Sequence, residues 1–97
     1  MTDSNERLHA IVHGIVQGVS FRYYTTEKAR DFKLTGWVMN RRDRTVEVVA
    51  EGSRENLEAL QRWLHDGSPS AQVERVDVTW ESATDEFTVF QTKYYLD

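Results

Sequence analysis

The sequence predicts an α+β domain in which two helices pack on one face of an antiparallel sheet of four to five strands. Short runs rich in β-branched residues alternate with two segments of helical periodicity. Their order along the chain is strand, helix, strand, strand, helix, strand, strand. A chain of 97 residues, 39% of them hydrophobic, has room for one core and therefore for one domain.

The first half of the chain is expected to hold a strand, a helix and a hairpin. Residues 8–16 are rich in Ile, Val, Leu and Ala, which favours a strand. Ser20, a typical N-cap residue, precedes a helix of about three turns. A hairpin follows, because residues 45–51 alternate between apolar and acidic side chains after the short apolar run 37–40. The helical spacing is set by Phe21, Thr25, Ala29 and Phe32.

The second half is expected to hold a helix and two strands. Ser53 is the next N-cap candidate, and leucines at helical spacing run up to a Gly-Ser-Pro stop at 67–69. Residues 73–80 and 87–95 alternate with period two and are expected to be strands. Residues 1–7 are expected to form a disordered tail before a domain of residues 8–97. This order is that of the ferredoxin-like βαββαβ sandwich, which serves many functions, so function must be argued from the site.

Composition excludes several classes of function. With 12 basic and 16 acidic residues the chain is acidic, which argues against a nucleic-acid binder. The absence of cysteine excludes disulfides and thiolate sites and fits a reducing compartment. No run approaches the roughly 18 apolar residues of a membrane span, and the start lacks an apolar signal region, so we expect a cytoplasmic protein. The basic run Arg41, Arg42 and Arg44 is either a solvated turn or an attraction for anionic substrates.

The segment from Gly14 to Arg22 has the features of an anion site. It joins a strand to a helix, and glycines there let several backbone N–H groups point inward. The start of a helix adds unpaired N–H groups and a positive dipole end. An arginine in the first turn opposes that dipole by roughly 0.3–1 kcal/mol, and a bound anion would remove the conflict. The alternative, which the spacing supports equally, is that Arg22 is an exposed arginine whose side chain turns into solvent.

Asn40 is the second candidate, at the point where a strand gives way to a turn. Turn asparagines are common, which is the simpler interpretation. An amide that both donates and accepts hydrogen bonds could instead hold a water molecule.

Together the two segments resemble the signatures of the acylphosphatase family. The first is Gly14 followed by Val16-Gln17-Gly18-Val19 and Phe21-Arg22, and the second is Gly36-Trp37-Val38-x-Asn40 followed by Asp43 and Val46-Glu47. The resemblance runs from about residue 8 to residue 94. Departures are Ile15 for a polar residue, Ser20 for a frequent glycine, and Arg44 for the usual turn glycine, which bears on the type of hairpin turn.

The resemblance implies an enzyme that hydrolyses the carboxyl-phosphate anhydride bond of acyl phosphates. Arg22 would bind the phosphate and Asn40 would orient the attacking water. A backbone cradle would be supplied by Gln17, Gly18, Val19, Ser20 and Phe21. No metal or cofactor is implied. The expected partners are a small acyl phosphate and inorganic phosphate, as product and inhibitor, with no nucleic acid, no membrane and a monomeric chain.

Two other functions remain open on the sequence. A ferredoxin-like domain could keep the anion pocket and sense a metabolite without turnover, or it could bind nucleic acid, which its acidity disfavours. His9 and His13 would share a metal ion only in a helix, because in a strand they lie ~13 Å apart. Turnover of an acyl phosphate is the observation that separates the enzyme from the sensor.

Overall fold

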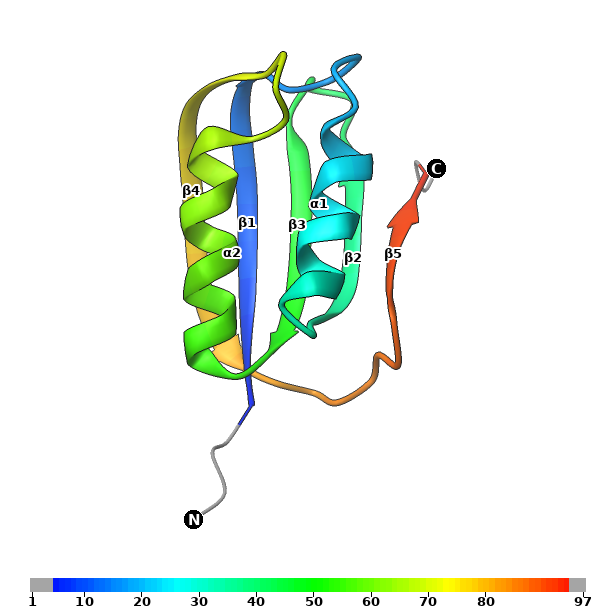
Figure 1. The fold of residues 1–97 in the computed structure, drawn as a ribbon, viewed down its shortest axis with the longest axis vertical. Helices are drawn as coiled ribbons and strands as arrows, with labels where there is room; N and C mark the ends of the chain where they lie inside the picture. Colours follow the sequence, from blue (N-terminus) through cyan, green and yellow to red (C-terminus); the bar gives the residue numbers. More distant parts are fainter. Residues whose placement is uncertain (1–4, 95–97) are drawn as a thin grey trace.

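The computed structural model describes residues 5–94 and confirms the expected two-layer fold, with both helices on one face of a five-stranded sheet. Figure 1 shows the helices side by side in front of the strands. Residues 1–4 of the expected tail, and Tyr95 of the expected last strand, lie outside the described residues. The elements are β1 (Glu6–Ile15), α1 (Phe21–Asp31), β2 (Thr35–Asn40), β3 (Val46–Gly52), α2 (Arg54–Asp66), β4 (Gln72–Ser82) and β5 (Phe90–Lys93).

The sheet has the order β4-β1-β3-β2-β5, and its four longer strands pair antiparallel. The expectation of a wholly antiparallel sheet is wrong for β5, which pairs parallel to β2. The segment between β4 and β5 runs past the lower end of the sheet in Figure 1, so β5 starts at the same end of the sheet as β2. The result is a mixed sheet.

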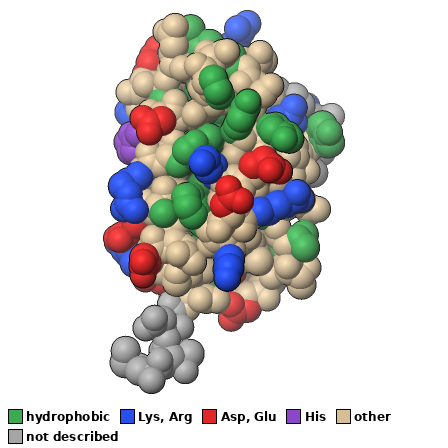
Figure 2. All heavy atoms as spheres, viewed as in Figure 1, with side chains coloured by type: hydrophobic (Ala, Val, Ile, Leu, Met, Phe, Trp, Pro, Cys, Tyr) green, Lys and Arg blue, Asp and Glu red, His purple; other side chains and the backbone are tan. Residues whose placement is uncertain are grey.

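The core lies between the sheet and the helices. Side chains of a strand alternate between its two faces, so every second residue of β1 and β3 is buried on the helical side. The leucines of α2 pack on them as the helical spacing predicted, and burying each such side chain contributes roughly 1.5–3 kcal/mol. The fully buried residues of these elements include Leu8, Ala10, Val12, Val46, Val48, Ala50, Leu57, Leu60 and Leu64. Acidic and basic side chains are interspersed on the outer face of the helices (Figure 2).

Strand boundaries differ from expectation at both ends of the chain. β1 begins at Glu6, two residues inside the expected tail, and β5 begins at Phe90 rather than Phe87. The backbone N–H groups of Thr84 and Asp85 donate to the buried carboxylate of Glu51, each at 2.9 Å. These two hydrogen bonds anchor the segment before β5 to Glu51, although the segment forms no strand ladder there. Within the described chain, no helix is long and apolar enough to cross a bilayer.

Candidate active site

The loop between β1 and α1 forms the expected strand-to-helix turn. Gly18 has φ 75° and Ser20 has φ 60°, both in the left-handed region. A side chain at Gly18 would meet no atom within 4 Å, so backbone conformation, not space, favours glycine there. Ser20 stands at the N-cap of α1, as predicted, but its side chain makes no capping hydrogen bond. The N–H groups at the start of α1 are therefore left available to an anion.

Beside this loop lies a cleft of about 720 Å³. Its walls include Arg22 from the first turn of α1 and Asn40 from the end of β2, which the sequence places 18 residues apart. The loop residues that line it are Val16, Gly18, Ser20 and Phe21. Gln17 and Val19, which the sequence analysis also assigned to the cradle, do not line the cleft. The structure thus brings the two candidate motifs to one place.

Arg22 reaches across the cleft toward β5. Its Nη1 donates to the carbonyl oxygen of Lys93 at 3.4 Å, and its guanidinium lies 5.3 Å from the ring centre of Tyr94. Among residues 5–94, no carboxylate forms an ion pair with Arg22. A guanidinium has five N–H donors, so most of its capacity is unused here. The half-buried arginine does not turn into solvent, which favours the anion-binding interpretation.

Asn40 carries an unpaired buried oxygen. The residue pairs with Val46 at the end of the β2–β3 ladder, and its Oδ1 has no hydrogen-bond partner within the described chain. Buried polar atoms almost always have a partner, so an orphaned acceptor requires an explanation. The oxygen itself is buried, so a water molecule in the cleft would donate to it after the amide rotates toward the cleft. Such a partner fits the water-holding interpretation better than the plain turn residue.

The side chain of Gln17 connects the loop to the β2–β3 hairpin. Its Nε2 donates to the carbonyl oxygens of Arg41 at 2.7 Å and Thr45 at 2.9 Å. Arg41 directly follows Asn40, so this contact ties the loop to the strand end that presents the amide. The family resemblance implied a role only for the backbone of Gln17. Its polar side chain, flanked by Val16 and Gly18, was the signal that could have suggested a further role.

The hairpin tip keeps a turn that favours glycine. Arg44 has φ 74°, so it adopts the left-handed conformation although it is not glycine. Asp43 Oδ1 accepts from the hydroxyl of Thr45 at 2.5 Å and from its N–H at 3.1 Å, and these bonds hold the pKa of Asp43 below its ordinary value. Arg41 contacts Glu47 at 3.2 Å. Arg42 and Arg44 line a separate hollow of about 330 Å³ rather than the main cleft.

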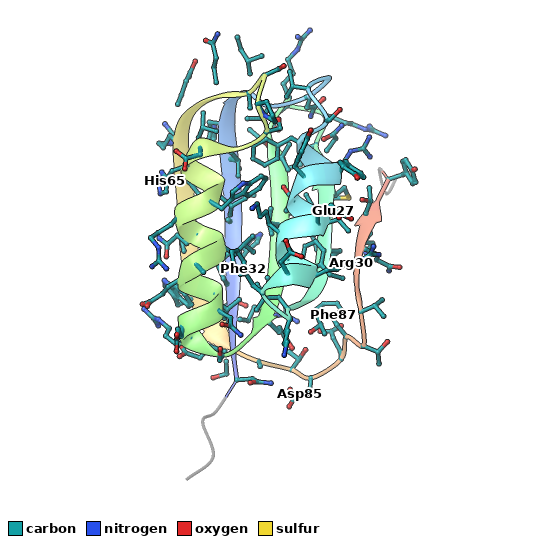
Figure 3. The ribbon with its side chains drawn as sticks, in the orientation of Figure 1. Glu27, Arg30, Phe32, His65, Asp85 and Phe87 are labelled. Carbon is teal, nitrogen blue, oxygen red and sulfur yellow. The ribbon has the colours of Figure 1, made fainter. Side chains whose placement is uncertain are left out.

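The cleft continues between α1 and β5. Thr26 contacts the hydroxyl of Thr92 at 3.1 Å, and Arg30 donates to the carbonyl oxygen of Phe90 at 3.2 Å. Glu27 and Arg30 both line this part, on the side of α1 that faces β5 (Figure 3). Its volume exceeds what a phosphate group needs, so there is room for a substituent on that phosphate.

The two histidines of β1 lie outside this cleft. Nε2 of His9 is 2.6 Å from Glu47, and Nε2 of His13 is 3.0 Å from Asp77. Each ring thus contacts a different carboxylate.

Known proteins resemble this chain along most of its length. The acylphosphatase family model matches residues 8–92. The chain belongs to the acylphosphatase family. It is 46% identical over 91 residues to an acylphosphatase of Pelotomaculum thermopropionicum, which covers 94% of this chain and 99% of that relative. Among solved structures, the acylphosphatase of Bacillus subtilis has a TM-score of 0.89 at 37% identity, covering 92% of this chain and 99% of that one.

A second solved acylphosphatase, from Coxiella burnetii, has a TM-score of 0.84 at 37% identity and covers 93% of this chain and 94% of its own. The family and its relatives support an acylphosphatase enzyme with the ferredoxin-like fold.

Proposed function

We propose that this chain hydrolyses acyl phosphates by direct, in-line attack of water on phosphorus. The family supports the activity. The mechanism is supported by one arrangement: Arg22 without a carboxylate partner and Asn40 with an unpaired buried oxygen, on the walls of one cleft within the described chain. The acyl phosphate is already activated, because a carboxylate is a good leaving group. The protein therefore needs mainly to position the reactants and stabilise charge.

The phosphate end of the substrate is held by the loop and by Arg22. We assign the cradle to the backbone N–H groups of residues 17–21 (Gln17, Gly18, Val19, Ser20 and Phe21), of which Gly18, Ser20 and Phe21 line the cleft. The positive end of α1 adds to it. Arg22 binds the equatorial oxygens. These contacts strengthen as charge spreads over those oxygens in the transition state, which makes them catalytic and not merely attractive.

The water end is held by Asn40. Its Oδ1 accepts a hydrogen bond from the water and so aims the lone pair of the water at phosphorus. The oxygen–phosphorus bond forms while the bond to the acyl oxygen breaks, and the carboxylate leaves. An amide is no base, so the proton passes to the phosphate itself. The products are a carboxylate and inorganic phosphate, without a metal or cofactor.

The proposal also covers the substrate, the oligomeric state, the location and the inhibitors of the enzyme. The proposed substrate is a small acyl phosphate, for which a cleft of about 720 Å³ has room. We propose a monomer in the cytoplasm, where a chain without cysteine fits the reducing conditions. Inorganic phosphate, as product, should compete with substrate, and sulfate should do the same because the site recognises the tetrahedral anion.

The deciding experiment is the loss of benzoyl phosphate absorbance with purified protein. We expect turnover that persists in excess EDTA and is inhibited competitively by phosphate and sulfate. Phosphate binding without turnover would establish the metabolite sensor instead. A strict requirement for Mg²⁺ would contradict the metal-free mechanism.

A further inference from the structure

Ser68 reaches the anion loop from a distant part of the chain. It lies just after α2, in the turn that leads to β4, and only 2% of it is exposed. Its hydroxyl donates to the carbonyl oxygen of Val19 at 2.7 Å, across 49 residues of sequence. Gly67 makes this approach possible, because a side chain there would come within 2.6 Å of the ring of Phe21. The turn after α2 therefore packs directly beneath the loop.

This hydrogen bond sets the direction of the next backbone donor. The peptide bond between Val19 and Ser20 is trans, like the others in the described chain. In a planar trans peptide the C=O and the following N–H point in opposite directions. The carbonyl of Val19 points to the buried hydroxyl of Ser68, so the N–H of Ser20 points the other way. Gly18, Ser20 and Arg22 line the cleft, whereas Ser68 does not.

We infer that Ser68 is a positioning residue for the phosphate cradle: it holds the Val19–Ser20 peptide so that the N–H of Ser20 faces the anion. The inference rests on the proposed function, in which this loop binds phosphate. Ser68 itself touches no substrate. The left-handed backbone of Ser20, with φ 60°, is a conformation that needs support from its surroundings, and the bond to Ser68 supplies some of it.

A purely structural role for Ser68 makes a different forecast. A buried hydroxyl must have a partner, and Val19 could serve only to satisfy it. In that case the loss of the hydroxyl would lower stability and leave phosphate binding unchanged. Binding and stability must therefore be measured separately.

The test compares Ser68→Ala and Ser68→Thr with Leu57→Val. The alanine removes the donor and the threonine keeps a hydroxyl. Leu57→Val removes one buried methylene in the core, at the opposite end of α2 from Ser68. For Ser68→Ala we expect the inhibition constant of phosphate and the KM of benzoyl phosphate to rise together by roughly three- to tenfold, as for one lost hydrogen bond. The kcat should fall as well, because the cradle contacts are stronger in the transition state than in the ground state.

The controls decide between the two roles. Ser68→Thr should restore phosphate binding, and Leu57→Val should lower the urea midpoint without changing the inhibition constant. An unchanged inhibition constant in Ser68→Ala, with only the midpoint lowered, would overturn the inference. The proposed function would survive that result, because turnover by the wild-type chain tests it independently.

A measurement on the wild-type chain keeps the inference testable if Ser68→Ala does not fold. Titration with inorganic phosphate, followed by amide NMR, should shift the Ser20 resonance as strongly as those of its neighbours in the loop. A response that spares Ser20 would overturn the role of Ser68 alone. No response at any loop amide would overturn the phosphate cradle, and this inference with it.

Discussion

At the scale of single residues, the proposed site divides its work between two side chains. Arg22 lines the cleft without a carboxylate partner, and Asn40 has an orphaned acceptor there, among the described residues. They come from different elements and meet different parts of the substrate. Substituting Arg22 and substituting Asn40 should therefore impair phosphate binding and kcat to different extents, which makes each role separately testable.

Arg22→Ala should abolish turnover and weaken phosphate binding together. Arg22 contacts the anion in the ground state and in the transition state, so its loss should lower both phosphate affinity and kcat. Arg30→Ala is the matched control, because Arg30 lies on the same helix and also donates to a β5 carbonyl. It should leave the affinity for inorganic phosphate unchanged. Wild-type kcat/KM in purified Arg22→Ala would end the assignment.

Asn40→Ala should leave phosphate affinity nearly intact while kcat falls by about 10²–10³, the usual effect of losing one well-placed polar contact. Asn40→Asp keeps the size but brings a negative charge toward the phosphate. It should therefore damage affinity as well as rate, although a carboxylate could act as a base. Phosphate affinity, kcat and the urea midpoint are the measurements. A normal kcat with a lowered midpoint would make Asn40 a turn residue only.

At the scale of elements, the contact between the loop and the β2–β3 hairpin matters most. Gln17 holds it with two hydrogen bonds, so this side chain controls how far Asn40 sits from the cradle. Gln17→Glu keeps the shape but removes both donors and sets a carboxylate against two carbonyl oxygens. We expect stability to fall by about 1–3 kcal/mol and kcat to fall more than phosphate affinity. Equal losses of rate and affinity would show that Gln17 supports only the loop.

The sequence predicted those elements whose pattern is local. Leu57, Leu60 and Leu64 give the helical period of α2 directly, and the alternation in residues 45–51 gives β3. Contacts between distant segments leave no such period. Glu51 contacts Thr84, in the segment that precedes the parallel strand β5, and Ser68 contacts Val19 only after the chain has folded.

The candidate site shows the same division. Arg22 and Asn40 were identified from their motifs, since each stands where an element begins or ends. The partners that hold the site in shape could not be found in this way. Gln17 Nε2 and the Ser68 hydroxyl bond to residues far away in the sequence. No periodic pattern in the sequence could therefore predict these contacts.

At the scale of the whole molecule, β5 and the segment before it are held near the site by contacts with α1 and with Glu51. One face of α1 reaches β5 through Arg22, Thr26 and Arg30, at successive turns of the helix. Below the sheet, the segment that carries Asp85 and Phe87 (Figure 3) is anchored at Glu51. β5 is a four-residue edge strand, so these contacts add to its pairing with β2 in keeping it next to Arg22.

Glu51 should make the stability of the whole domain sensitive to acid. Burial alone would raise the pKa of this carboxyl, but hydrogen bonds from Thr84, Arg7 and Asp85 outweigh it and hold the pKa below its ordinary value. Its contribution is therefore complete above the unfolded pKa of about 4.3 and is lost as the pH falls through the folded pKa. Glu51→Gln should destabilise the protein by about 1–3 kcal/mol at pH 7, and the difference from wild type should close below about pH 4. Glu86→Gln is the control: it also contacts Arg7 but is exposed, so it should cost less. Urea midpoints from pH 7 to pH 3 measure both variants, and a difference between Glu51→Gln and wild type that does not change with pH would show that the charge of Glu51 contributes nothing.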